Sequence, residues 1–186
     1  MLVPTFVLAL LLPGALAPEV SDSDRLPAFA LENFDGRVFS NESFTGKTTL
    51  VVPTYAKCIF ACPMITFFLT ELDKELGSPE DLQYVHVSVQ PSEDTAEEIL
   101  EHFEDHSIDA TADPRWMFVN GPEKEVAEFL TDADVHVTRT QVDEGVLIEH
   151  TTRIFVVGPD GETLATFDSY FWDEKEMRHA LRYAIE

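Results

Sequence analysis

Residues 50–63 read Leu-Val-Val-Pro-Thr-Tyr-Ala-Lys-Cys-Ile-Phe-Ala-Cys-Pro and contain the only two cysteines of the chain, Cys58 and Cys62. An apolar run opens the stretch, and apolar residues with helical spacing continue after it as far as Leu72. We therefore place the cysteines where a strand ends and a helix begins. Thiols there face the positive end of a helix dipole, which favours the thiolate, the form that acts as nucleophile and as metal ligand.

The cysteine pair leaves two interpretations open. Two sulfurs are an incomplete set for most metals, but one imidazole would complete a soft three-coordinate copper site. The alternative is structural, with Cys58 and Cys62 forming a disulfide or lying buried as thiols. The identity of a third ligand therefore decides most of the functional interpretation.

The composition narrows the class of partner. The chain has 186 residues, enough for one domain with a sizeable core, and carries 35 acidic against 12 basic residues for a net charge of −23. Without a basic stripe, we expect no nucleic-acid binding and no docking on anionic lipid. The acids are spread from Glu19 to Glu186, which favours a solvated surface; the alternative is complementarity to a basic or metal-loaded partner.

The N-terminal residues 1–17 have the layout of a secretory signal: no charged side chain, an apolar run, a Pro-Gly breaker and an Ala-Leu-Ala exit. The segment lacks a preceding Lys or Arg, and Pro18 follows the expected cleavage point, so an uncleaved N-terminal membrane anchor is the alternative. Residues 18–27 form an acidic spacer. We expect an exported protein of the periplasm or the extracytoplasmic face of a bacterial membrane, where the redox state of the cysteines affects function.

Residues 28–186 read as one α/β domain. A hairpin turns at Asp35-Gly36, a second hairpin joins strands 153–157 and 163–167, and Thr95 with Glu98 forms a capping box. The remaining expected elements are strands 48–55, 82–89 and 116–119, and helices from the cysteines to Leu76, from Thr95, over 123–130 and from Asp173 to the C-terminus. This order predicts a thioredoxin-like fold, with a central mixed sheet flanked by helices and an N-terminal β-hairpin.

The chain resembles the Sco/SenC family of copper-binding proteins. The resemblance rests on four segments in the expected order: Tyr55–Pro63, Val87–Thr95, Trp116–Gly121 and Ile148–Gly161. It departs at Gln90, where an acidic residue is usual, and at Ile59, where proline is frequent. These differences leave the expected ligands in place and alter their surroundings.

The resemblance implies that Cys58, Cys62 and His150 bind one copper ion per monomer, as Cu(I) or Cu(II). It also implies a metallochaperone that delivers copper to, or reduces the cysteines of, the binuclear copper site of cytochrome c oxidase subunit II or another copper-dependent envelope protein. On this interpretation the protein is not primarily an enzyme.

The other histidines receive structural interpretations. His102 and His106 are spaced as an i, i+4 metal pair, but the surrounding glutamates predict a solvated helix face. His86 shares a strand face with Tyr84, and we expect it to be structural. His150 itself becomes a candidate ligand only through the family resemblance.

Two enzymatic alternatives use the same cysteines. A thiol–disulfide oxidoreductase of the cell envelope would use Cys58 as attacking thiolate and Cys62 as resolving thiol. Such reductases carry a proline in the loop facing the pair, whereas residues 147–152 contain His150 and no proline, which favours metal binding. A peroxidatic enzyme would need Thr54 and Arg153 beside the cysteine, which is the weaker case.

Overall fold

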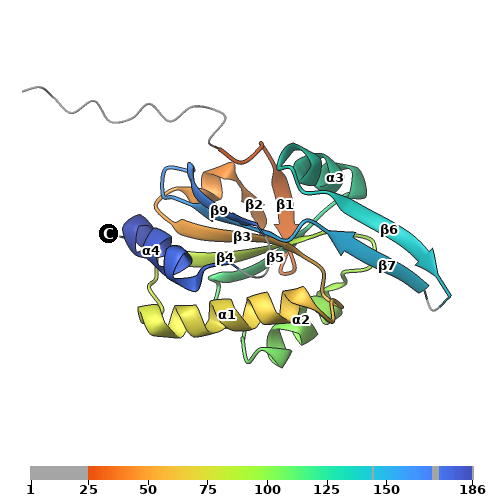
Figure 1. The fold of residues 1–186 in the computed structure, drawn as a ribbon, viewed down its shortest axis with the longest axis horizontal. Helices are drawn as coiled ribbons and strands as arrows, with labels where there is room; N and C mark the ends of the chain where they lie inside the picture. Colours follow the sequence, from red (N-terminus) through yellow and green to blue (C-terminus); the bar gives the residue numbers. More distant parts are fainter. Residues whose placement is uncertain (1–24, 144, 169–171, 186) are drawn as a thin grey trace, which may run out of the picture.

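The computed structural model describes residues 25–143, 145–168 and 172–185, so the predicted signal or anchor and most of the acidic spacer lie outside the described residues. A seven-stranded mixed sheet with the order β2-β1-β5-β4-β3-β8-β9 forms the centre of the molecule (Figure 1). Its strands are β1 (Ala30–Asn33), β2 (Val38–Ser40), β3 (Thr48–Thr54), β4 (Leu82–Ser88), β5 (Trp116–Asn120), β8 (Arg153–Val157) and β9 (Thr163–Asp168). The helices are η2 (Asn41–Phe44), α1 (Ala61–Leu76), α2 (Ala96–Asp105), α3 (Glu123–Asp132) and α4 (Glu174–Ile185).

The sheet is buried on both faces because helices cover each of them. Helices α1, α2 and α4 lie on one side and α3 on the other (Figure 1). Strand β4 divides the core accordingly: Val85 and Val87 belong to the cluster packed by α3, whereas Tyr84 belongs to the cluster packed by α1, α2 and α4. Parallel pairing of β4 with both β3 and β5 places these strands at the centre of the domain.

The local sequence signals are confirmed. Thr95 caps α2, and its side chain and that of Glu98 form the reciprocal capping box. Gly77 ends α1 in the left-handed conformation, with φ of 79°. Both expected hairpins form, since β1 pairs antiparallel with β2 and β8 pairs antiparallel with β9.

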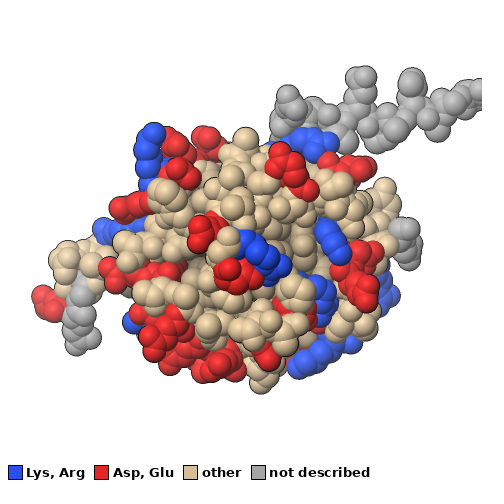
Figure 2. All heavy atoms as spheres, turned by 180° about the vertical axis from the view of Figure 1, so that it is seen from behind, with Lys and Arg blue, Asp and Glu red and all other residues tan. Residues whose placement is uncertain are grey.

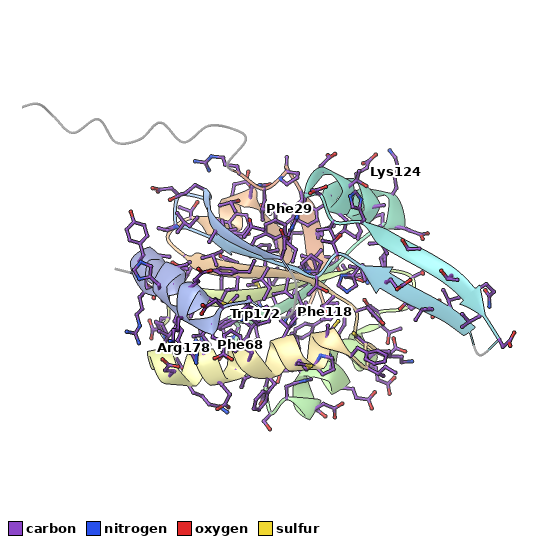
Figure 3. All side chains as sticks on the ribbon, viewed as in Figure 1. Phe29, Phe68, Phe118, Lys124, Trp172 and Arg178 are labelled. Carbon is purple, nitrogen blue, oxygen red and sulfur yellow. The ribbon has the colours of Figure 1, made fainter. Side chains whose placement is uncertain are left out.

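Helix α4 closes the domain against α1. Figure 3 shows Phe68 of α1, Trp172 and Arg178 of α4 directed toward one another. The rings of Phe68 and Trp172 lie 5.2 Å apart, and the Arg178 guanidinium stacks over Phe68 at 5.7 Å. Asp173 accepts a hydrogen bond from the Lys175 amide, as expected for the residue that begins this helix.

The structure adds a hairpin that the sequence analysis missed. Strands β6 (Val137–Val142) and β7 (Gly145–His150) form a separate two-stranded antiparallel sheet that projects beside the main one (Figure 1). The sequence pattern predicts no strand over residues 137–150. Strand β6 is mostly exposed and has no buried apolar face, so it lacks the periodicity that predicts a strand. The four β-branched residues among 137–142, two Val and two Thr, were the available strand signal.

The expectation of a solvated face for His102 is wrong. His102 is buried, and its Nε2 lies 3.2 Å from the hydroxyl of Thr66 on α1. The acidic side chains beside it on α2 do face solvent, so the sequence pattern concealed one buried histidine among them. His86 is fully buried and stacks on Phe103, as a structural residue does, and burial lowers its pKa well below the ordinary value.

None of the helices in the described part of the chain is both long enough and apolar enough to cross a bilayer.

Candidate metal and thiol site

The two cysteines lie where the sequence predicted, between the end of β3 and the first turn of α1. Strand β3 ends at Thr54 and α1 begins at Ala61, so Cys58 lies in the connecting loop and Cys62 in the helix. A turn in which the Cys58 amide donates to the Tyr55 carbonyl at 3.2 Å shapes the loop. No side chain caps the N-terminus of α1, which leaves its first amides available to the sulfur of Cys58.

Cys58 has the electrostatics of a reactive thiolate. The Cys62 thiol donates a hydrogen bond to it, and the backbone amides of Phe60 and Cys62 and the Tyr55 hydroxyl add further donors. These donors outweigh partial burial and lower the pKa of Cys58 to about 5. Cys58 is therefore ionised at neutral pH, as a nucleophile or a soft metal ligand must be.

Cys62 has the opposite character. It is buried, and its hydrogen bond to the Cys58 sulfur, together with desolvation, raises its pKa far above that of an ordinary thiol. Both cysteines are free in the structure. One thiolate supported by one protonated thiol is thus the state that the local geometry favours.

Asp94 anchors the cysteine loop through hydrogen bonds to its buried carboxylate. Its carboxylate accepts a hydrogen bond from the Ala56 amide at 2.9 Å and another from the Ser88 hydroxyl. Burial raises the pKa of Asp94 to about 6, although both hydrogen bonds act in the opposite direction. The residue joins the end of β4 and the start of α2 to the loop that carries Cys58.

His150 ends β7 and approaches the same region from the opposite side. Its ring stands edge-on to Tyr55, with centroids 6.2 Å apart, and its Nδ1 lies 3.0 Å from the Thr151 carbonyl oxygen. Because a carbonyl oxygen can only accept a hydrogen bond, Nδ1 of the neutral ring carries the hydrogen and Nε2 keeps the lone pair. Burial lowers the pKa of His150, which keeps the imidazole neutral and able to bind a metal.

Cys58 and His150 line one cavity of about 610 Å³ between the cysteine loop and β7. Its other lining residues are Tyr55, Lys57, Ile59, Phe60, Ala61, Gln90, Glu93, Asp94, Val146, Leu147, Ile148, Glu149 and Thr152. In the described ranges, no three His, Cys, Asp or Glu side chains are already gathered closely enough to hold a metal ion. Two thiols and an imidazole are donor types that fit copper, although the described side chains do not stand at the spacing of an assembled three-ligand site.

The structure brings some of the candidate residues proposed from the sequence together and places others elsewhere. It brings Cys58, Cys62 and His150 to one end of the sheet and places Gln90 in the same cavity. Arg153, required for the peroxidatic alternative, instead pairs with Asp134 and Asp168 and is not among the residues that line this cavity. Sequence reasoning missed Tyr55 and Asp94, although both lie in segments that carried the family resemblance.

A low-pKa cysteine before the first long helix of a mixed α/β sheet, with a second cysteine in that helix, defines a thioredoxin-like thiol protein. The SCO1/SenC family model matches residues 18–186, and the chain belongs to that family. Among curated relatives, it is 26% identical over 142 residues to the SCO1 protein homolog of Bacillus subtilis, covering 75% of this chain and 72% of that protein. It is 25% identical over 145 residues to the human mitochondrial SCO1 homolog, covering 75% of this chain and 46% of that one.

Solved structures confirm the thioredoxin-like fold. The SCO1/SenC family lipoprotein of Bacillus anthracis superposes with a TM-score of 0.72 at 19% identity, over 87% of this chain and 95% of that one. ScoI of Bradyrhizobium japonicum, solved with copper bound, gives 0.67 at 23% identity, over 85% of this chain and 98% of that one. At these identities the likeness establishes the arrangement of strands and helices.

Proposed function

We propose that this protein binds one copper ion as cargo through Cys58, Cys62 and His150, and delivers it during assembly of a copper enzyme. The observation that carries the proposal is the low-pKa Cys58 thiolate, in contact with Cys62 and in one cavity with His150. Thiolates are soft ligands that suit Cu(I), and an imidazole helps retain the ion as Cu(II). Membership of the SCO1/SenC family supports the same assignment.

The three proposed ligands would bind copper from different protonation states. Cys58 is already ionised and offers the first sulfur, whereas Cys62 must lose its proton as the metal arrives, since a metal-bound sulfur is a thiolate. His150 offers Nε2 while the Thr151 carbonyl holds Nδ1. Movement of β7 toward the cysteine loop would complete the set.

The proposed client and the proposed compartment are inferred from the relatives of this chain. A relative of known structure is described as a member of the Sco family of cytochrome c oxidase assembly proteins, and we propose subunit II of that enzyme, or another copper-dependent envelope protein, as the client. Other relatives are a lipoprotein and a mitochondrial protein. Together with the signal-like residues 1–17, they support an exported protein acting in the periplasm or at the outer face of the bacterial membrane.

Thiol–disulfide exchange is the second candidate, favoured by the asymmetry of the two thiols. A low-pKa attacking cysteine beside a protonated resolving cysteine is the arrangement that reductases use. Reduction of the client's cysteines and delivery of copper both require Cys58 and Cys62. His150 separates them, because only copper binding needs its imidazole.

The test measures copper stoichiometry on reduced, purified protein for the wild type, His150→Ala and, as a matched control, the exposed His179→Ala. We expect one copper per monomer in the wild type and control. The His150 variant should lose Cu(II) affinity by about 100-fold or more while retaining Cu(I) on two thiolates. Oxidation of the cysteines to a disulfide should abolish Cu(I) binding. Tighter binding of zinc than of Cu(I), or no sulfur in the X-ray absorption spectrum of the copper complex, would refute the assignment.

A further inference from the structure

The exposed apolar side chains of this acidic protein are concentrated around the cysteines. Seven of the nine large hydrophobic side chains that the described residues expose lie on the cysteine loop, the start of α1 or the β6–β7 hairpin: Ile59, Phe60, Met64, Phe67, Val142, Val146 and Leu147. The other two, Val38 and Tyr183, lie elsewhere on the domain. Single exposed apolar residues need no explanation, but a concentration of them marks an interaction surface.

The geometry of α1 makes four of these residues one patch, which we call the loop patch: Ile59, Phe60, Met64 and Phe67. Met64 and Phe67 follow the i, i+3 spacing of one face of α1, which points away from the buried Ile65 and Leu69. Phe60 is the exposed residue that directly precedes the helix. Ile59 extends the patch to the cavity that holds Cys58 and His150. Across this cavity, Val146 and Leu147 of β7 present a second apolar edge.

An acidic surface borders the loop patch. Figure 2 shows acidic side chains gathered over the region of α2, at the lower left of that view. Helix α2 is held beside the start of α1, since the His106 ring lies 3.1 Å from the Pro63 carbonyl oxygen. Lys57, next to Cys58, forms an ion pair with Glu98. It also interacts electrostatically with Glu93 and Glu101, so three acidic side chains surround this one cation.

We propose that the loop patch and its acidic border dock a protein segment with apolar side chains around a cysteine and with Lys or Arg on its flanks. This deepens the proposed function, because such a segment would be the part of the client that receives copper or is reduced. Aromatic side chains at the centre of an interface supply most of the affinity, and the complementary charges raise the association rate. The acids beside the patch disfavour anionic lipid as its occupant.

The probe is a synthetic peptide with one cysteine, linked to a second copy of itself by a disulfide, with apolar residues around the cysteine and either Lys or Glu flanks. The Cys58 thiolate attacks one peptide sulfur, the peptide disulfide breaks and one peptide leaves as thiolate. Cys62 then loses its proton to water and attacks the Cys58 sulfur, releasing the second peptide thiolate. The protein dithiol supplies both electrons and ends as a disulfide. This readout requires no copper, so its result is independent of the metal-binding assignment.

We expect the Lys-flanked peptide to react about 10-fold faster than the Glu-flanked one at low ionic strength, and the difference to disappear at high salt. The double variant Glu93→Gln, Glu101→Gln should lose most of this preference, whereas Glu123→Gln, Glu125→Gln on α3 should retain it. Phe60→Ser, Phe67→Ser should slow reaction with both peptides about 5-fold, while the equally exposed pair Val38→Ser, Tyr183→Ser should react like the wild type.

Equal rates for the two peptides, or equal effects of the loop patch and control variants, would overturn the proposal. If the proposal holds, the wild type should not bind phosphatidylcholine vesicles through this patch. Vesicle binding that is lost in Phe60→Ser, Phe67→Ser without a change in peptide exchange would assign the loop patch to lipid and also overturn the proposal. Copper binding in the same variants is measured alongside: a variant that exchanges slowly yet binds one copper ion separates failed docking from failed metal binding.

Discussion

The cysteine loop and the β6–β7 hairpin supply the two halves of the candidate site, and they are built differently. The loop joins a central strand to a long helix, and its Ala56 amide donates a hydrogen bond to the Asp94 carboxylate. The hairpin is a separate two-stranded sheet, attached through buried Ile148 and through Arg139, whose guanidinium donates to the Val89 carbonyl at 2.8 Å. An isolated two-stranded hairpin is marginally stable, so its order depends on these attachments.

On the proposed function, this difference would allow a metal cargo to be taken up and released. The thiol half is organised before any metal arrives, with one sulfur already ionised. The imidazole half stands on an element that can open locally at lower free energy than the core. The proposed copper carrier would need such an arrangement, because a site with all its ligands rigidly in place would hold its cargo instead of passing it on.

The largest expected effect tests the organisation of the thiol half. In Cys62→Ala the first donor to the Cys58 sulfur disappears, so the pKa of Cys58 should rise from about 5 toward the ordinary thiol value of ~8.5. The thiolate fraction near pH 6 should then fall by about 100-fold. The ultraviolet thiolate absorbance, followed against pH, measures this directly.

Cys62→Ser is the matched control, because its hydroxyl can still donate to the Cys58 sulfur. Its titration should lie closer to the wild type than to Cys62→Ala. A Cys62→Ala titration that stays near pH 5 would show that the helix amides alone hold the thiolate, and that the second cysteine does not organise the first.

The thiol half was also the part that sequence could predict. A strand, a turn with cysteines and an amphipathic helix each have a local signal, and those signals agree with the tertiary structure around Cys58 and Cys62. The hairpin was missed because its exposed strand β6 lacks a buried face, so its pairing rests on tertiary attachment. Asp94 was missed for a related reason: an acidic residue within an acidic segment reads as solvated, and only the fold shows that it is buried.

The next prediction concerns Asp94 and the pH dependence of stability. Its folded pKa of about 6 exceeds the unfolded value of ~3.9, so the folded state binds the proton more tightly. This contribution is fully present below about pH 4 and is lost as pH rises through 6. In Asp94→Asn that loss should be absent, which makes the variant's stability flatter over this range by about 2 kcal/mol.

Urea unfolding of the two proteins at a series of pH values measures the difference. The exposed Asp105→Asn serves as the control and should reproduce the wild-type slope. A slope unchanged by Asp94→Asn would mean that water solvates this carboxylate in the folded protein, and that Asp94 supports the loop only through its hydrogen bonds.

The smallest effect tests the hairpin half. Arg139→Ala removes the hydrogen bond to Val89 while the buried Ile148 stays in place, so the hairpin should open more often without unfolding the domain. We expect amide hydrogen exchange in residues 137–150 to accelerate by about 3- to 5-fold, as the loss of about 1 kcal/mol of local stability requires, and exchange in β3 and β4 to stay unchanged. Arg37→Ala, which removes the exposed pair with Asp35 in the β1–β2 turn, is the matched control and should leave residues 137–150 as they are. If Arg139→Ala instead accelerated exchange equally in β3, β4 and the hairpin, the two halves would unfold as one unit and the contrast between them would be wrong. If the hairpin alone responds, the proposed function predicts that the same variant releases Cu(II) faster than the wild type, since the proposed ligand His150 stands on the element that has been loosened.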